Sequence, residues 1–501
     1  MERKKIGRRD FLRLSAGAAA GAVLAGCKPQ VVKETVEVVQ TVEVEKKVEV
    51  EKLVTPTPAR DVYNLPNAAT GIPYEIKPSI NNGEPIEFDY WEWALDRSDY
   101  EIEWVHEYMN IYPNVTINLV TQGWDDHFTK MMVSAPAGEG PAFFHMHTNM
   151  LTEFCDGSLM DPMPDYVASQ IHLDGHWTGF REGAFDCPGG SGQRYFIPMG
   201  AQMPLLFINR RLWEEAGLTD DDVPKSWEEL RSVAKALTKY DDAGRIQQAG
   251  FQIGPMDIWM LNGLYQQGRY AFTKDRKRAQ LDNEEAYNTV KFIQDLYQVD
   301  KVIDVDFPGM TEAFSSELTA IGFTESWFAS VVRRNNPDLD WFPALMPTYT
   351  GSLEPAIGRL HFAVEAIVNA YAPVEVKKVA WDFWHFLYSN DERLVRTISL
   401  RNGMVPAYDK LQRHPAVKAD PFANVVASGL DHGIVIAEKP AVWSTTVQQF
   451  VWDPVLLGEM EIRNALQAAQ EEADAQLAQR EAWNILERNY KHDDMMIPNQ
   501  P

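Results

Sequence analysis

The sequence predicts an α/β protein, and three observations carry this prediction. The chain has 501 residues, of which 45% are hydrophobic and 11% aromatic, so it can bury sizeable cores and is not globally disordered. Between residues 86 and 120, a strand pattern, a helix pattern and a second strand pattern follow one another. No apolar run reaches the ~20 residues of a membrane-spanning helix.

The first βαβ unit is defined by its periodicity. Residues 86–93 alternate between apolar and polar side chains, which is typical of a strand, and residues 99–112 place apolar side chains on one helical face. Pro113 ends that helix, and residues 115–120 form the second strand. The short spacing indicates a parallel sheet with a right-handed crossover.

Ligands of parallel sheets bind beyond the carboxyl ends of the strands. Trp93 and Asp96 follow the first strand at that position, and Trp91 shares a strand face with Trp93. We therefore expect Trp93 and Asp96 to contact a ligand. The alternative is that these tryptophans belong to the core of the sheet.

Further elements follow along the chain. Strand-like runs occupy residues 142–147 and 205–209, and residues 210–217 form a short helix that ends at a glycine. Ser226 and Glu229 have the spacing of a capping box, which predicts the start of another helix.

The charge of the chain bears on its partners. The net charge is −25, which argues against nucleic-acid binding because that function needs a basic face. The chain also contains 15 tryptophans, a high number that suits a ligand with flat faces on which rings can stack.

The N-terminus is predicted to be an export signal. Arg8 and Arg9 lie in the segment RRDFL, which resembles the twin-arginine motif. A short Ala/Gly-rich stretch leads to Cys27 in the segment LAGC, which resembles a lipobox. Residues 1–26 would then be a signal peptide and Cys27 the lipidated residue, anchored by more than one acyl chain on the extracytoplasmic face of the plasma membrane. A chance Ala/Gly helix with a cysteine is the alternative.

The segment 27–84 is predicted to be a linker. Residues 35–52 contain three related hexads in which valine alternates with charge, and residues 55–58 read Thr-Pro-Thr-Pro. Proline enforces extension, so we expect an extended tether. A coiled-coil stalk competes with this interpretation, but the valine spacing does not hold a heptad.

Several segments resemble one family. They are YFIPMGAQMPLLFINRRLWEEAGL from residue 195, PKSWEEL from 224, FSSELTAIGFTESW from 314, AWDFWHFLYSND from 380 and RNGMVPA from 401. In this order they are similar to family 1 extracellular solute-binding proteins, the receptors of ABC importers, typified by sugar-binding lipoproteins. The resemblance covers about residues 85–490. Ser316-Glu317-Leu318 departs from the small residues usual in the family at that turn.

This resemblance implies a periplasmic-binding-protein-like fold of type II, with two α/β lobes and a ligand cleft between them. Lobe I would comprise residues 85–202 and 362–402, and lobe II residues 203–361 and 403–501. The implied partners are a small-molecule solute and the transmembrane subunits of an ABC permease, and the chain would be a monomer. By the same analogy, the chain would cross between lobes near residues 200–204, 358–364 and 401–404.

Carbohydrates offer hydroxyls at the ring edge and C–H groups on the ring faces, so a sugar site needs aromatic planes and planar hydrogen-bonding groups. The resemblance places Trp327 as a stacking residue, Gln202 at the first crossover and Arg359 near the second. Trp259 and Trp443 are further candidates. Core packing for the tryptophans and a salt bridge for Arg359 are the alternatives.

His145 and His147 point to the same side of a strand, a spacing that can serve a metal ion. No other ligand spacing accompanies them, so we expect no metal and no cofactor, and we assign His147 to the cleft as a hydrogen-bonding residue. Cys155 and Cys187 remain after lipidation. They can form a disulfide or stay as two thiols.

The sequence therefore predicts a lipid-anchored solute receptor of an ABC importer that binds a mono- or oligosaccharide and is not an enzyme. Two alternatives remain. One is a secreted glycosidase-like enzyme that uses carboxylates such as Glu92 and Glu325, although no spacing pairs them. The other is a receptor for a polyamine, a peptide or an organic anion, the last of which Arg359 would suit.

Overall fold

The computed structural model describes residues 74–147, 150–168, 187, 193–198, 200–363, 365–435, 439–480, 487–489 and 495–501. All of them belong to one compact unit, Thr57–Pro501. The predicted signal and lipidation residues Arg8, Arg9 and Cys27 lie outside the described residues, as does the linker up to residue 73. None of the helices in the described part of the chain has both the length and the apolar character needed to cross a membrane.

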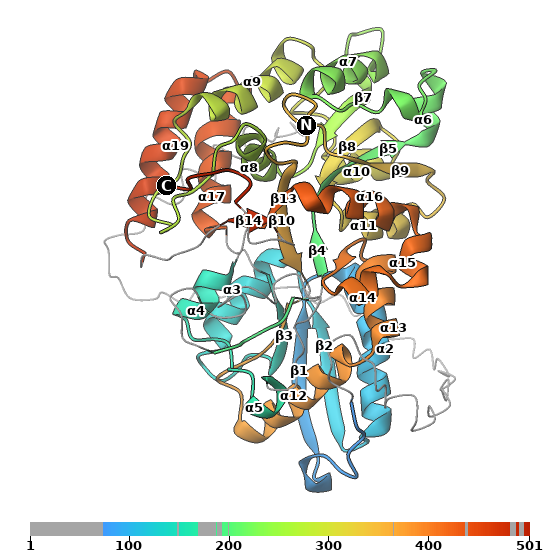
Figure 1. The fold of residues 1–501 in the computed structure, drawn as a ribbon, viewed down its shortest axis with the longest axis vertical. Helices are drawn as coiled ribbons and strands as arrows, with labels where there is room; N and C mark the ends of the chain where they lie inside the picture. Colours follow the sequence, from blue (N-terminus) through green and yellow to red (C-terminus); the bar gives the residue numbers. More distant parts are fainter. Residues whose placement is uncertain are drawn as a thin grey trace, which may run out of the picture. The chain divides into compact units, whose positions relative to one another are not determined.

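The first sheet has four strands in the order β11-β3-β1-β2, of which Figure 1 labels β3, β1 and β2. They are β1 (Ile86–Glu92), β2 (Val115–Thr121), β3 (Phe143–Met146) and β11 (Glu365–Val368). β1 pairs in parallel with β2 and β3, and β11 is antiparallel to β3. The predicted parallel βαβ unit is confirmed.

Helix α2 (Leu95–Ile111) connects β1 to β2 and begins four residues earlier than the apolar spacing predicted. The Glu92 carboxylate accepts hydrogen bonds from the backbone N–H groups of Trp93 and Ala94, at 2.6 and 2.8 Å. These bonds satisfy donors just before the helix, which lets it start close to the strand.

Aromatic side chains fill the core between the first sheet and helix α12 (Val374–Tyr388). The ring of Phe143 lies 4.9 Å from that of Tyr90 and 5.1 Å from that of Phe383, both with steep interplanar angles. Edge-to-face pairs of this kind stabilise the core beyond the area that they bury.

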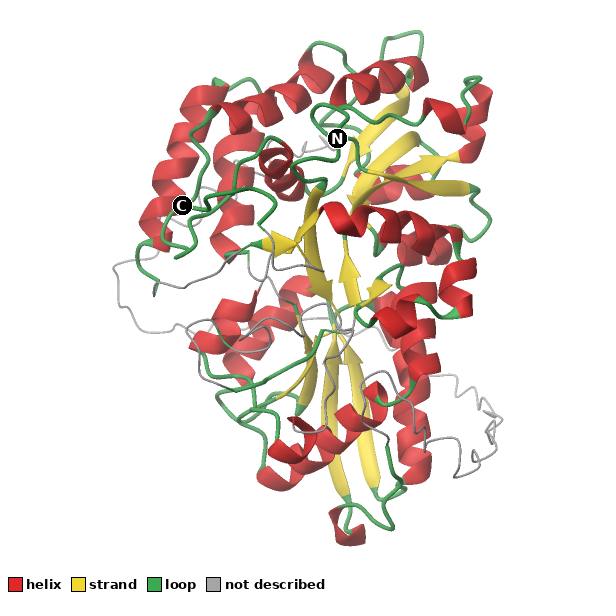
Figure 2. Cartoon of the chain, viewed as in Figure 1, coloured by secondary structure: helices red, strands yellow, loops and turns green. Residues whose placement is uncertain are grey.

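The second sheet has five strands in the order β6-β7-β8-β5-β9. They are β5 (Pro204–Asn209), β6 (Lys239–Tyr240), β7 (Ile246–Ile253), β8 (Thr319–Glu325) and β9 (Trp341–Leu345). Every residue of β5 is buried, as its continuous apolar run predicted. Leu206 and Ile208 enter one core while Leu205 and Phe207 enter another, so the sheet is covered on both faces (Figure 2).

The remaining helices follow in chain order. They are α3 (Trp124–Ser134), α4 (Leu151–Asp156), α5 (Asp165–Ala168), α6 (Arg210–Glu215), α7 (Trp227–Leu237), α8 (Met256–Gln266), α9 (Glu284–Gln298), α10 (Met310–Ser315), α11 (Phe328–Asn335), α13 (Asp391–Leu394), α14 (Asp409–Gln412), α15 (Pro415–Ala419), α16 (Pro421–Gly429), α17 (Ala441–Thr446), α18 (Asp453–Leu456) and α19 (Ile462–Leu477). Short 3₁₀ turns span Asn81–Gly83, Asp220–Asp222 and Leu430–His432, and π-helical segments span Val395–Arg401 and Val447–Trp452. The predicted capping box of Ser226 and Glu229 opens α7.

A third sheet contains the segments at which the chain was expected to cross. Its order is β12-β4-β10-β13-β14, with β4 (Gly200–Gln202), β10 (Gly358–Ala363), β12 (Val405–Pro406), β13 (Gly433–Val435) and β14 (Arg488–Asn489). β4 precedes β5 of the second sheet, and β10 precedes β11 of the first sheet. The chain therefore passes between the first and second sheets, the larger ones by the length of their strands, along neighbouring strands of the third. The exact lobe boundaries stay a prediction.

Gly403, next to β12, shows how closely the chain segments approach one another in this region. Its φ is +66°, and a Cβ at this position would lie 2.6 Å from the backbone oxygen of Ser326. Both the positive φ and this close approach require glycine.

The sequence leaves open whether the two remaining cysteines pair, and in the structure they do. Cys155, in α4, forms a disulfide with Cys187, and their Cα atoms are 5.7 Å apart. The bond closes a sequence interval of 32 residues. A disulfide across such an interval lowers the conformational entropy of the unfolded chain. In the chain-entropy treatment this stabilises the folded state by about 3–4 kcal/mol.

The segment before β1 is fastened to the first sheet's helices by a buried carboxylate. Asp382, in α12, accepts hydrogen bonds from the phenols of Tyr74 and Tyr108, at 2.8 and 2.7 Å, and pairs with Lys77. Burial and the nearby Asp382 raise the pKa of Tyr74 and of Tyr108 far above the usual value, so both phenols stay protonated as donors.

Replacing Asp382 by Ala should therefore lower the free energy of unfolding by about 2–4 kcal/mol, because it leaves buried donors without an acceptor. Denaturant unfolding measures this change. Lys378→Ala on the same helix is the control, since its exposed pair with Glu375 should contribute within about 0.5 kcal/mol. Equal stability of the two variants would contradict this role of Asp382.

Candidate functional site

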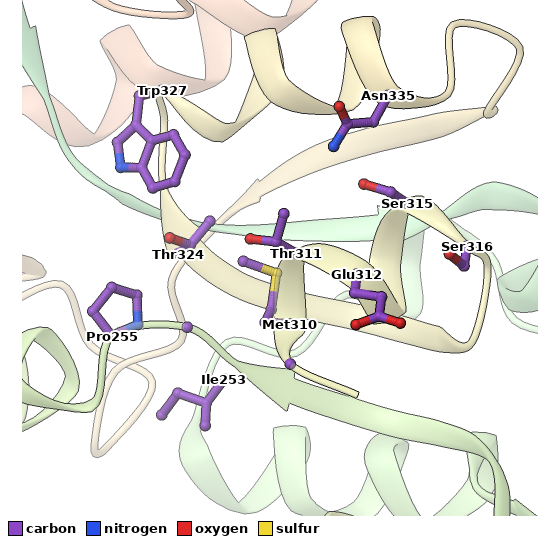
Figure 3. Close-up of a pocket in the computed structure, with 12 residues that line it drawn as sticks. Ile253, Pro255, Met310, Thr311, Glu312, Ser315, Ser316, Thr324, Trp327 and Asn335 are labelled. Atoms are coloured by element: carbon purple, nitrogen blue, oxygen red, sulfur yellow. The ribbon is translucent and has the colours of Figure 1, made fainter. Parts of the chain in front are cut away.

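A cavity of about 780 Å³ lies beyond the carboxyl ends of β7 and β8 (Figure 3). It is lined by Ile253, Gly254, Pro255, Gly309, Met310, Thr311, Glu312, Ser315, Ser316, Thr324, Trp327 and Asn335. Its volume is within the range of small-molecule sites, and strand ends are where α/β proteins bind ligands.

Trp327, which we expect to stack on a ligand, lines this cavity (Figure 3). It stands at the start of α11, directly after Ser326, and remains partly exposed. Its indole packs against the core of the first sheet and against the core that contains Phe328. The ring is therefore held from two sides while part of it stays available to a ligand.

A buried charged cluster lies at the end of β8, next to Thr324 of the cavity wall. Arg359 of β10 donates to Oε1 of Glu325 from Nε at 2.9 Å and from Nη2 at 2.6 Å. Nδ1 of His361 lies 3.1 Å from the same oxygen. All three side chains are almost completely buried.

The predicted residues Gln202 and His147 join this cluster. Gln202 of β4 stands opposite His361 in the pairing of β4 with β10. His147 follows β3 of the first sheet, and its ring centroid lies 5.0 Å from that of His361. The structure thus brings Gln202, Arg359 and His147 together from three different parts of the chain.

Burial and charge act together on the titratable groups of this cluster. Burial by itself would raise the pKa of Glu325, but Arg359 and His361 outweigh it and hold that pKa well below its usual range. Burial, more than any neighbouring charge, lowers the pKa of His147 and of His361. Glu325 is therefore ionised at neutral pH and the two imidazoles are uncharged.

Several buried polar atoms around the cluster have no hydrogen-bond partner among the described residues. They are Oε1 of Gln202, Oγ1 of Thr324, Oγ of Ser326, Nη1 of Arg359 and Nε2 of His361. Buried polar atoms in native proteins nearly always have a partner, whether protein, water or ligand. Of these residues only Thr324 lines the cavity, so its hydroxyl can meet a ligand there. The other atoms indicate a place for ordered water or for further ligand hydroxyls.

Trp93 lies in an aromatic and histidine group on the first sheet. Its ring is 6.1 Å from that of His147 and 5.4 Å from that of Trp124. Trp124 also contacts His147, at 5.1 Å, and is 41% exposed. The sequence patterns did not single out Trp124, although it follows the end of β2, where the strand-end rule that selected Trp93 also applies.

The other sequence candidates occupy different places. Asp96 belongs to helix α2. Trp259 is fully buried between Phe292, whose ring is stacked at 5.7 Å, and Phe323, at 4.9 Å edge-on. Trp443 is buried in the same core. Neither Trp259 nor Trp443 lines the cavity beside Trp327.

One buried cluster has the donors that a metal ion would use. Nε2 of His145 lies 3.0 Å from Oε1 of Glu101 and 3.4 Å from Oε2 of Glu92. The rings of His145 and His147 both lie 6.1 Å from that of Trp93, but His147 contacts His361 and not the two glutamates. Glu92 also caps the backbone before α2, so this cluster has a structural role.

The uncharged histidines make the stability of the protein depend on pH. Below about pH 6.5 the unfolded chain binds protons that buried His147 and His361 resist, so the free energy of unfolding should fall as the pH drops from about 6.5 toward their lowered pKa values. The slope should be at most about 1.4 kcal/mol per pH unit for each histidine. Glu325 adds a further loss below about pH 4.3.

The measurement is denaturant unfolding between pH 7.5 and 5. The double variant His147→Gln, His361→Gln should have a clearly smaller slope than the unmodified chain. His106→Gln, on the exposed side of α2, should keep the original slope. An unchanged slope in the double variant would contradict this account.

Comparison with known proteins shows what this architecture is. Residues 96–393, more than half of the chain, match the model of the bacterial extracellular solute-binding protein family. A maltotriose-binding protein of Pyrococcus abyssi is 23% identical over 341 residues, which are 67% of this chain and 70% of that protein.

Two solved structures share the fold. A solute-binding protein of an ABC transporter from Thermotoga lettingae, bound to alpha-D-tagatose, has a TM-score of 0.66 at 19% identity and covers 78% of this chain and 99% of its own. The maltose/maltodextrin-binding domain MalE of Bdellovibrio bacteriovorus, bound to maltotriose, has a TM-score of 0.65 at 17% identity, with 78% and 100% covered. The two-lobed α/β fold expected from the sequence is confirmed. The chain belongs to the family of bacterial extracellular solute-binding proteins.

Proposed function

We propose that this protein is the receptor of an ABC importer that binds a carbohydrate and delivers it to a membrane permease. One observation carries the proposal: partly exposed Trp327 and the buried Thr324 hydroxyl, which has no partner among the described residues, line one cavity. The neighbouring cluster adds further buried polar atoms without such a partner, from Gln202, Ser326, Arg359 and His361. An aromatic plane beside fixed donors and acceptors suits the two kinds of surface that a sugar presents.

The charge of the cluster favours an uncharged ligand. Glu325 holds Arg359 through two hydrogen bonds, so neither charge of this buried pair is left unopposed. Glu312 is the one charged residue among those that line the cavity itself. An organic anion would have to compete with Glu325, and a polyamine would have to compete with Arg359. The maltotriose-binding relative and the sugar-bound structures of the same fold support the carbohydrate.

The geometry does not favour the glycosidase alternative. A general acid needs a carboxyl group whose pKa is raised, whereas Arg359 and His361 lower the pKa of Glu325. The other carboxylate considered, Glu92, accepts hydrogen bonds from two backbone N–H groups before α2. We therefore propose binding without chemical change of the ligand.

Closure of the two lobes would follow from contacts made on both sides. His147 and Trp93 come from the first sheet, Trp327 from the end of β8, and Gln202 and Arg359 from the strands between the larger sheets. A ligand that touches all three groups stabilises the closed arrangement over the open one. The export motif at Arg8 and Arg9 and the lipobox at Cys27 support an anchored, extracytoplasmic location.

A thermal-shift screen tests the solute class with monosaccharides, oligosaccharides, polyamines and organic anions as separate arms. A carbohydrate at a hundredfold excess over its Kd should stabilise the protein by about 2.7 kcal/mol. Stabilisation by a polyamine or an organic anion, with none by any carbohydrate, would overturn the proposal.

Thr324→Val tests the site itself. The Thr324 hydroxyl has no partner among the described residues, so its removal should leave stability unchanged but raise the Kd for the carbohydrate about 5–10-fold. Thr319→Val on the same strand is the matched control. Its hydroxyl lies within hydrogen-bond distance of the Ala249 and Ile321 carbonyls, so this variant should lose stability and keep its affinity. Titration calorimetry and thermal unfolding report the two quantities, and the reverse pattern would contradict the site.

A further inference from the structure

We propose that the buried cluster of Glu92, Glu101 and His145 binds one divalent transition-metal ion, with Zn²⁺ as the ion that fits it best. The three residues come from three elements, β1, α2 and β3. None of them is among the residues that line the cavity beside Trp327. The metal site is therefore separate from that cavity, and it does not rest on the proposed carbohydrate function.

The sequence pattern predicted no metal, because it paired His145 with His147 and found no further ligand spacing near them. In the structure the other donors come from the end of β1 and from α2, and His145 lies 44 residues after Glu101 along the chain. A ligand set assembled from distant segments has no spacing that a local pattern can detect. The structure thus supplies the donors that the sequence pattern lacked.

The three donors suit a transition metal. One imidazole nitrogen and two carboxylate oxygens are groups that Zn²⁺ binds in proteins. Calcium takes about six to eight oxygen ligands, and magnesium keeps several waters around an all-oxygen site. A cluster that includes a histidine nitrogen therefore favours Zn²⁺ over either of these ions.

The distances between the donors fit one ion. Nε2 of His145 lies 3.0 Å from Oε1 of Glu101 and 3.4 Å from Oε2 of Glu92. Bonds of about 2.0–2.2 Å to zinc, at angles of about 90–110° to one another, place two ligand atoms about 2.8–3.6 Å apart. Both measured distances lie in that range. The three ligand atoms all lie within 4.8 Å of one another, so a small shift of one carboxylate completes the set.

The Glu92 carboxylate is already oriented for such a role. Its Oε1 accepts hydrogen bonds from the backbone N–H groups of Trp93 and Ala94, at 2.6 and 2.8 Å. Its Oε2 is the atom that lies near His145. Hydrogen bonds to a ligating carboxylate are typical of metal sites, because they fix its direction. The contact with the backbone before α2 and the contact with a metal ion use different oxygens, so they are compatible.

The His145 ring points its Nε2 into the cluster. The side chain is 2% exposed, and its Nδ1 has no hydrogen-bond partner among the described residues. The polar side-chain contacts that the described residues make with this ring are thus those of Nε2 with the two glutamates. A proton on Nε2 can make one linear hydrogen bond and so serves one carboxylate at a time. A metal ion at the same place binds both.

Burial makes the proposed ion a contributor to stability. All three side chains are at most 2% exposed. Buried carboxylates are costly unless they are paired or bind a metal. An ion shared by β1, α2 and β3 exists as a site only when these elements are folded together, so its binding free energy adds to the stability of the fold.

Thermal unfolding of the full chain with metal ions tests this inference. The chain is stripped with EDTA, and ZnCl₂ or CaCl₂ is then added in separate arms. Zinc at a hundredfold excess over its Kd should raise the unfolding midpoint by about 2–4 °C, and elemental analysis after gel filtration should find one zinc per chain. Calcium at the same concentration should have a clearly smaller effect.

Two variants locate the ion in the cluster. Glu101→Gln keeps an oxygen that can accept from Nε2 of His145, and Glu92→Gln keeps one that can accept from the backbone, so the two substitutions preserve these hydrogen bonds. Each should weaken zinc binding by about 100-fold or more, because it removes a carboxylate ligand. The matched control is Glu103→Gln, on the exposed side of α2, which should bind zinc as the unmodified chain does. The midpoints in EDTA show which variants fold, and either of the two cluster variants is sufficient for the test.

Three results would overturn the metal site. They are no stabilisation by zinc, equal stabilisation by calcium, or zinc binding that survives in a folded Glu101→Gln or Glu92→Gln variant. The first would leave the cluster as a histidine hydrogen-bonded to glutamates, and the last would place the zinc elsewhere on the chain. None of the three bears on whether the cavity beside Trp327 binds a carbohydrate.

Discussion

The site depends on the buried pair of Glu325 and Arg359. The two residues come from the end of β8 and from β10, so the pair joins the second sheet to the strands between the larger sheets. The desolvation of each ion is offset only by the other, and removal of one partner of such a pair is strongly destabilising. Asn262 of α8 also holds the backbone of Arg359, at 2.8 Å. This fixed pair sets the position of His361 and, through the register of β4 and β10, that of Gln202.

Local sequence rules predicted the elements well and their long-range contacts poorly. The βαβ unit and the capping box at Ser226 follow from neighbours in the chain, and both were confirmed. By contrast, the sequence leaves Glu325 open as a catalytic carboxylate. Nothing in its own segment reveals that it pairs with Arg359, 34 residues away. The strand-end rule selects Trp93, and applied to β2 it would also select Trp124, which lies next to it. The sequence thus predicted segments that lie near the candidate site, but not which of their side chains pair with one another.

The tryptophans show the same limit of local patterns, which do not predict contacts between distant parts of the chain. Trp259, Trp327 and Trp443 are alike in residue type, but Trp327 alone among them stays partly exposed and lines a cavity. Trp259 and Trp443 are enclosed by rings from elements distant in the chain, such as Phe292 and Phe272. Burial of this kind depends on tertiary packing, which periodicity within a segment does not contain.

The attachment of Tyr74 and Lys77 to Asp382 has a mechanical consequence. A force applied to the backbone at Tyr74 would act first on α2 and α12, through the hydrogen bonds of Tyr74 and Tyr108 to Asp382 and the ion pair of Lys77 with it. These two helices pack on the first sheet, so the first sheet would bear the load.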